Sequence, residues 1–194
     1  PRKSIREVNE VLNHKNALVI TGMRQVGKTT LMRQLFEKWE DKTKLWFDLD
    51  NPLDQKVFEG EDYRQIYKRL LLMAGGQKER LLLAIDEIQN LPEITRFIKY
   101  AIDHYQVKFI VTGSSSFYLK NLFPESLSGR KFLYQLVPMT FTEYLYFTEE
   151  LGLEQALGES RAGIFRQEDW VLAESRRQAY ETYLVFGGFP EVVL

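Results

Sequence analysis

Short apolar runs alternate along the chain with longer segments in which apolar residues recur three or four positions apart. The runs are five to seven residues long and are bounded by polar residues or glycine, which is typical of buried strands. The predicted strands are Ala17–Thr21, Lys44–Leu49, Leu81–Ile85, Lys108–Thr112 and Lys131–Val137. The predicted helices are Ser4–Leu12, Thr29–Trp39, Asp62–Met73, Ile94–Ile102 and Glu168–Phe186. This alternation favours an α/β fold, with a parallel sheet and helices on both of its faces.

Two places interrupt the pattern. Asn51-Pro52 breaks the spacing after the second strand, and no strand is expected from Phe141 onward, where the mixed segment Thr148–Gln167 precedes the last helix. That helix is expected to end at Gly187-Gly188, because glycine is the common residue just past a helix end.

The loop between the first strand and the next helix carries a complete phosphate-binding motif, G-x-x-x-x-G-K-T, at Gly22–Thr29. Backbone N–H groups at the start of such a helix point toward one spot, and the positive end of the helix dipole favours an anion there. Lys28 is expected to reach the β- and γ-phosphates, and the Thr29 hydroxyl to hold Mg²⁺. The residues predicted to bind the nucleotide here are Gly22, Arg24, Gln25, Val26, Gly27, Lys28, Thr29 and Thr30.

Composition narrows the class of protein without changing this interpretation. The 194 residues, 44% hydrophobic and 27% charged, are ordinary for a globular domain with a substantial core. With 26 basic and 27 acidic residues the net charge is −1, which gives no global support for nucleic-acid binding. The chain contains no cysteine, which excludes disulfides and zinc–thiolate sites. It contains no membrane-length apolar run and no signal peptide, so a cytoplasmic location is expected.

Two acidic residues follow the third predicted strand. Asp86 comes directly after the apolar run, at the edge of the sheet where α/β proteins bind ligands. Asp86 is expected to contact Mg²⁺ through water, and Glu87 to act as the general base that polarises the attacking water. A solvated strand end is the alternative for the pair alone, but the phosphate-binding motif upstream favours the functional interpretation.

Two further polar positions lie at strand ends. Ser114 follows the fourth strand and is favoured as a hydroxyl that contacts the γ-phosphate or orients the water, with Thr112 or Ser115 as substitutes and a helix cap as the other interpretation. Arg130 precedes the fifth strand. It is either a solvated turn residue or a finger that one subunit supplies to the γ-phosphate of its neighbour.

The order of these segments resembles one family, the prokaryotic AAA-domain ATPases on the origin-recognition/STAND side of the AAA+ superfamily. Members are ATP-binding proteins that often carry a C-terminal domain of unknown function. The resemblance spans nearly the whole chain. It rests on Gly22–Thr30, Asp48–Asp50, Asp86–Gln89, Thr112–Ser115, Ser126–Arg130, Leu136–Tyr144 and Gly187–Pro190.

The resemblance implies a P-loop fold, a three-layer sandwich whose five-stranded parallel sheet has the order 5-1-4-3-2, followed by a helical lid. On this basis residues 1–140 form the ATPase core, and residues 141–194 are the start of a lid that is truncated. The resemblance also places Arg130 at the arginine-finger position, which implies a homo-oligomer. It makes Gly188-Phe189-Pro190 similar to a turn that packs near adenine, so Pro190 is expected at the nucleotide; a helix stop followed by a rigid turn is the other interpretation.

ATP with Mg²⁺ is the expected ligand, since the chain contains no guanine-reading motif. The expected activity is an ATPase that couples ATP binding or hydrolysis to a conformational change in an attached domain or a partner. The alternative is a nucleotide-gated binding switch with little turnover, in which DNA is one candidate partner.

Overall fold

The computed structural model describes residues 8, 10–39, 43–76, 80–113, 129–148 and 170–190. Its centre is a sheet of five parallel strands in the order β2-β3-β4-β1-β5. Counted from the other edge, this order is 5-1-4-3-2, so the predicted α/β class and strand order are confirmed. The strands are β1 (Ala17–Thr21), β2 (Lys44–Asp48), β3 (Leu81–Asp86), β4 (Val107–Gly113) and β5 (Lys131–Gln135).

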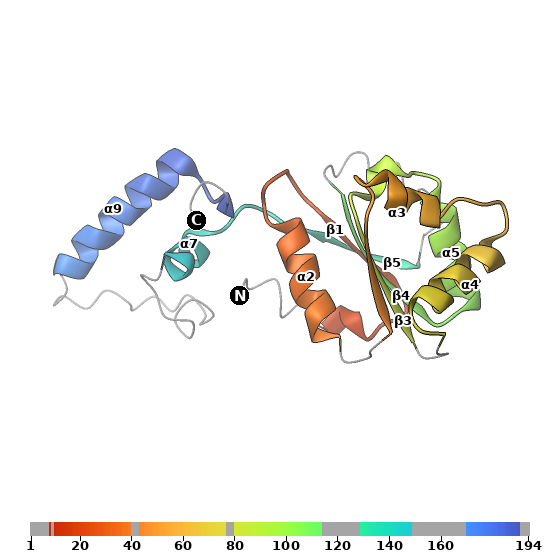
Figure 1. The fold of residues 1–194 in the computed structure, drawn as a ribbon. Coiled ribbons are helices and arrows are strands. Elements are labelled where there is room, and N and C mark those ends of the chain that lie inside the picture. Colours follow the sequence, from red (N-terminus) through yellow and green to blue (C-terminus); the bar gives the residue numbers. More distant parts are fainter. Residues whose placement is uncertain are drawn as a thin grey trace.

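Helices cover both faces of the sheet (Figure 1). On one face, α2 (Lys28–Lys38) buries apolar residues in a cluster that includes Leu18 of β1. On the other face, α4 (Tyr63–Met73) and α5 (Ile94–His104) do the same in a cluster that includes Val19. Because both faces are covered, every residue of β1, β3 and β4 is buried, which explains why these strands are mainly apolar in the sequence.

The carboxyl ends of the parallel strands all lie at the same end of the sheet. Thr21 at the end of β1 pairs with Gly113 of β4 and with Gln135 of β5. Asp86 ends β3 opposite Asp48 of β2. The phosphate-binding loop after β1 and the acidic pair at the end of β3 therefore lie at the same end of the sheet.

The interruption at Asn51-Pro52 is a helix start rather than a break in the structure. Helix α3 (Pro52–Val57) begins there, and the Asn51 side chain accepts a hydrogen bond from the Leu53 N–H at 3.0 Å. An asparagine cap followed by proline at the first helical position is a favourable way to begin a helix. Helix α3 has no buried residue, so its sequence lacks the apolar spacing that would have predicted it.

A second helix, α7 (Phe141–Phe147), was also absent from the predicted elements. Thr140 and Glu143 form a capping box at its start: the Glu143 N–H donates to the Thr140 hydroxyl at 3.3 Å, and the Thr140 N–H donates to the Glu143 carboxylate at 3.0 Å. This reciprocal pair satisfies two N–H groups that the helix itself leaves without partners. The cap, rather than an apolar stripe, was the signal in the sequence.

The C-terminal region is hydrogen-bonded to the backbone of Met139, in the segment after β5. Helix α9 is described over Trp170–Phe186, ends before Gly187 as predicted, and packs on α7. The Tyr183 hydroxyl donates to the Met139 carbonyl at 2.8 Å, and the Met139 N–H donates to the Gly188 carbonyl at 2.6 Å. No helix in the described ranges is long and apolar enough to cross a lipid bilayer.

Candidate nucleotide-binding site

The loop between β1 and α2 has the backbone geometry that its glycines predict. Gly27, the residue directly before α2, has φ +91°, and Gln25 also has a positive φ of +66°. The first turn of α2 contains no acidic residue and no side-chain cap. Its N–H groups and the positive end of its dipole are therefore available to an anion.

A cavity of about 330 Å³ lies over this helix start. Its wall brings together predicted residues from three distant parts of the chain: the loop and α2, the end of β3, and the segment after α9. The lining residues are Arg24, Gln25, Gly27, Lys28, Thr29, Thr30, Glu87 and Pro190. Each of them is a residue that the sequence, or the resemblance, marked as part of the site.

Lys28 is only 5% exposed although it carries a cationic group. Its Nζ donates to the Met23 carbonyl at 2.9 Å. Burial lowers the pKa of Lys28, the nearby carboxylates of Glu87 and Asp86 oppose that shift, and Arg24 adds to it. A partly desolvated ammonium beside a cavity is suited to binding an anionic group that restores its electrostatic partner.

The acidic pair is held by the neighbouring strand. Asp86, 5% exposed, accepts a hydrogen bond from the Thr112 hydroxyl of β4. The Glu87 N–H donates to the Asp86 carboxylate at 3.1 Å and to the Thr112 hydroxyl at 3.2 Å. These bonds fix Glu87 at φ +51°, an unusual conformation for a residue with a side chain. Glu87 lines the cavity, whereas Asp86 does not.

The Val26 side chain, and the place that a Cβ on Gly22 would take, lie in the core rather than in the cavity. A Cβ on Gly22 would lie 2.2 Å from the Leu136 carbonyl oxygen, so the close approach of the next segment after β5 explains this glycine. Val26 is fully buried in the cluster under α2. A contribution of these two residues to nucleotide binding is thus limited to their backbone groups.

Pro190 approaches the loop from the C-terminal segment. A Cβ on Gly27 would lie 3.8 Å from the Pro190 Cγ. The approach depends on Gly188, where a Cβ would lie 2.1 Å from the Met139 carbonyl oxygen. The two interpretations of this turn are therefore compatible, since it follows the helix stop and also lines the cavity.

Arg130 lies at the amino-terminal ends of the strands, which is the end of the sheet opposite the phosphate-binding loop. It precedes Lys131, which pairs with Ala17 at the start of β1, whereas the loop follows the end of β1. One strand of this length spans about 16 Å, which exceeds the reach of an arginine side chain. The Arg130 Nε donates to the Asp103 carboxylate of α5 at 2.6 Å, and this bond lowers the pKa of Asp103. Arg130 therefore does not contact the cavity of its own chain.

Residues 14–145 match a family model described as an AAA domain, and this stretch is more than half of the chain. The chain belongs to the AAA domain family. The curated relatives of this chain are themselves uncharacterised. The uncharacterized protein MJ1637 of Methanocaldococcus jannaschii is 30% identical over 152 residues, which is 75% of this chain and 31% of the relative. The uncharacterized protein Rv2008c of Mycobacterium tuberculosis is 29% identical over 141 residues, or 72% and 29%. The chain thus spans about a third of the length of these relatives.

Solved structures share the fold. The ORC1 protein of Aeropyrum pernix, in complex with DNA, superposes with a TM-score of 0.56 at 17% identity, over 75% of this chain and 48% of that one. The ORC2 protein of the same organism, in its ADP form, gives a TM-score of 0.54 at 17% identity, over 98% and 58%. At this identity the likeness shows the fold alone. The AAA family assignment supports an ATPase-like, nucleotide-binding domain.

The donor set of this AAA domain fits Mg²⁺ bound together with phosphate. Mg²⁺ is held by one or two protein oxygens plus water and phosphate oxygens rather than by an all-protein cage. The Thr29 hydroxyl and the Asp86 carboxylate are oxygen donors of this kind, and the described residues contain no group of three or more acidic or histidine ligands. The residues fit a metal that arrives with the nucleotide.

Two sequence predictions have different outcomes here. Ser114, the favoured hydroxyl, lies outside the described residues, and its role stays a prediction. Its suggested substitute Thr112 contacts both acidic residues. Gln89, which the sequence did not mark as functional, donates from its side-chain amide to the Glu87 carboxylate. The available signal was its place in the segment Asp86-Glu87-Ile88-Gln89, directly after the strand.

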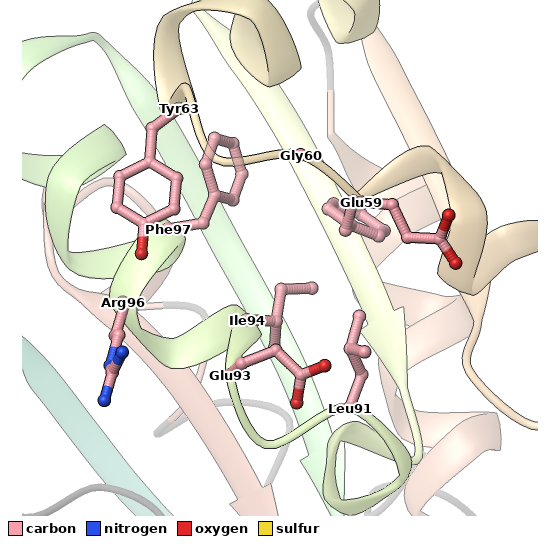
Figure 2. Close-up of a pocket in the computed structure, with 9 residues that line it drawn as sticks. Glu59, Gly60, Tyr63, Leu91, Glu93, Ile94, Arg96 and Phe97 are labelled. Atoms are coloured by element: carbon pink, nitrogen blue, oxygen red, sulfur yellow. The ribbon is translucent and has the colours of Figure 1, made fainter.

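A second cavity of the AAA domain, of about 260 Å³, lies between the α3–α4 connection and the start of α5 (Figure 2). Phe58, Ile94 and Phe97 are buried core residues in its wall, and Glu93 lies beside it in Figure 2. It contains none of the residues predicted to bind nucleotide. The short 3-10 helix η1 (Ile88–Asn90) lies between the two cavities along the chain. Glu87, which precedes it, lines the first cavity, and Leu91, which follows it, lines the second.

Proposed function

We propose that this AAA domain binds ATP with Mg²⁺ and hydrolyses it to ADP and phosphate. The observation that carries the proposal is the single cavity in which a desolvated lysine, an uncapped helix start and a strand-end glutamate meet. The first two groups favour a triphosphate. The third supplies a carboxylate within the same cavity, which a site made only for binding does not require.

Each residue has a separate role in this proposal. Backbone N–H groups of Gly22–Thr30 and the Lys28 ammonium bind the phosphates, and this binding orients the γ-phosphate toward Glu87. Thr29 and Asp86 are the residues that would hold Mg²⁺, which neutralises phosphate charge when bound. Glu87 accepts the proton of the attacking water as the water oxygen bonds to the γ-phosphorus. The bond from that phosphorus to the β–γ bridging oxygen breaks in the same step, and ADP leaves. Ser114 is proposed to contact the γ-phosphate.

Arg130 is proposed to act on a neighbouring subunit. Arg130 lies at the amino-terminal ends of the strands, away from the loop of its own chain, and this place supports action in trans. The hydrogen bond to Asp103 holds the Arg130 guanidinium there. An arginine supplied in this way contributes on the order of 10³–10⁵ in rate by stabilising the charge of the transition state. The proposal therefore includes a homo-oligomer in which the end of the sheet that carries Arg130 in one subunit faces the cavity of the next subunit.

We divide the chain into an ATPase core, residues 1–140, and the start of a helical lid, residues 141–194. Support comes from Pro190, which belongs to the second part and lines the cavity of the first. A nucleotide that contacts Pro190 changes the contacts between the two parts, and this is the proposed route by which binding or hydrolysis reaches an attached domain or partner. The proposed position of the adenine is beside Pro190.

Single-turnover hydrolysis of Mg-ATP, with Glu87→Gln as the matched control, tests the proposal. The variant keeps the shape of the side chain but lacks the base, so it should bind Mg-ATP as the wild type does and hydrolyse it at least tenfold more slowly. Equal rates in the two proteins, with binding intact in both, contradict the hydrolytic role. They establish the alternative, a nucleotide-gated switch, for which binding to duplex DNA with and without ATP is the next measurement.

A further inference from the structure

Lys28 and Glu87 carry opposite charges in one cavity and yet form no ion pair within the described part of the chain. Each is held by another group. The Lys28 Nζ donates to the Met23 carbonyl at 2.9 Å, and the Glu87 carboxylate accepts a hydrogen bond from the Gln89 side-chain amide. Among the charged groups near Lys28, Glu87 opposes the lowering of its pKa the most, as an opposite charge does.

The segment that carries Gln89 is fixed in place. Ile88 at the start of η1 is fully buried, and the Asn90 N–H donates to the Glu87 carbonyl at 3.0 Å. The Asn90 side-chain amide donates to the Asp50 carboxylate, which attaches the same turn to the segment after β2. Gln89 is therefore presented to Glu87 by a short turn with anchors on both sides of it.

We propose that Gln89 is a positioning residue that keeps the Glu87 carboxylate apart from the Lys28 ammonium. An ion pair between them would disable both groups, since a paired lysine cannot bind phosphate with its full charge and a paired carboxylate is a poor proton acceptor. The Gln89 amide satisfies one carboxylate oxygen and leaves the other for water. This inference rests on the proposed function, because it assigns Gln89 a task between the ATP-binding and hydrolytic groups.

Isothermal titration with Mg-ATP on four proteins tests the inference without depending on turnover: wild type, Gln89→Ala, Glu87→Gln and the double variant. Gln89→Ala frees Glu87 to pair with Lys28, and affinity should fall roughly tenfold, because the Lys28 ammonium then meets the phosphates with part of its charge already paired. Glu87→Gln should bind at least as well as wild type. The double variant should recover the affinity of Glu87→Gln, because the charge that captures Lys28 is gone.

This recovery separates positioning from a structural role. If Gln89→Ala weakened binding by loosening the turn, removing the Glu87 charge would not restore it. Asn90→Ala is the matched control on the same turn; it breaks the contact with Asp50 and should leave affinity within about twofold of wild type. In single-turnover assays at saturating ATP, Gln89→Ala should also be slower than wild type.

Three outcomes overturn the inference, and they differ in what else they affect. Wild-type affinity in Gln89→Ala, or a double variant as weak as Gln89→Ala, refutes the role of Gln89 and leaves the proposed function standing. A wild-type protein that does not bind Mg-ATP refutes the proposed function and the inference together.

Discussion

Lys108 of β4 is a fully buried lysine whose effect on stability can be worked out from its surroundings. Its side chain is 0% exposed, and its Nζ donates to the carbonyls of Val11, His14 and Asn16 at 2.9, 2.9 and 2.7 Å. Burial, with the nearby Arg80 adding to the effect, lowers its pKa from 10.5 to about 7. We predict that replacing it by methionine removes a large pH dependence from the stability of the domain.

The sign follows from proton binding. Between pH 7 and pH 10.5 the unfolded chain holds a proton on Lys108 that the folded chain has lost, so the free energy of unfolding rises with pH in this window. One pKa unit corresponds to about 1.4 kcal/mol. From pH 7 to pH 9 this single lysine adds about 2 kcal/mol to the stability of the wild type. Lys108→Met has no such group and lacks that rise.

Urea unfolding at pH 7, 8 and 9, for wild type and Lys108→Met, measures the effect as the change in their stability difference. The exposed Lys38→Met variant is the matched control and should follow the wild type. Lys108→Met also leaves these carbonyls without the Nζ donor, which can serve three of them as an ammonium and two as a neutral amine. Each buried carbonyl that stays unsatisfied costs about 1–3 kcal/mol. The variant should therefore fall furthest below the wild type at pH 9. Parallel stability curves for the two proteins would refute the reasoning.

Three further predictions concern the site and the segment that closes it. Lys28→Ala should lower Mg-ATP affinity at least a hundredfold in a calorimetric titration, because the phosphates lose their buried cation; unchanged affinity contradicts the loop assignment. Gly188→Ala puts a Cβ 2.1 Å from the Met139 carbonyl oxygen and should cost about 3 kcal/mol in urea unfolding, whereas a wild-type midpoint contradicts the close approach. Arg130→Ala should slow turnover without weakening ATP binding, and wild-type rates that do not change with protein concentration argue against action in trans.

The buried strands were predictable because a parallel sheet covered on both faces leaves mainly apolar positions in its central strands. The element β1 (Ala17–Thr21) has the predicted bounds without change. Helices α3 and α7 were missed for the converse reason. Their starts are specified by Asn51-Pro52 and by the Thr140/Glu143 box, which apolar periodicity does not register.

Site residues divide in a similar way. The phosphate-binding loop is local in sequence, and its glycines and lysine are constrained by one turn, so a motif specifies them. Gln89 and Gly188 matter through contacts with specific atoms of Glu87 and of Met139, 49 positions upstream of Gly188. A contact of this kind depends on how the turn after β3 and the segment after α9 return to the core. Residue type and spacing alone do not specify that return.

At the amino-terminal ends of the strands, a network of hydrogen bonds surrounds Arg130 and does not include the nucleotide cavity. Lys108 binds the Asn16 carbonyl, the Asn16 side-chain amide donates to the Gly129 carbonyl at 3.0 Å, and the Ala17 N–H donates to the Arg130 carbonyl at 2.8 Å. The cavity is one strand length away, about 16 Å. Lys108→Met should therefore alter steps that use Arg130 while leaving Mg-ATP affinity at its wild-type value. Loss of Mg-ATP affinity in that variant would mean that the two ends of the sheet are coupled through β1.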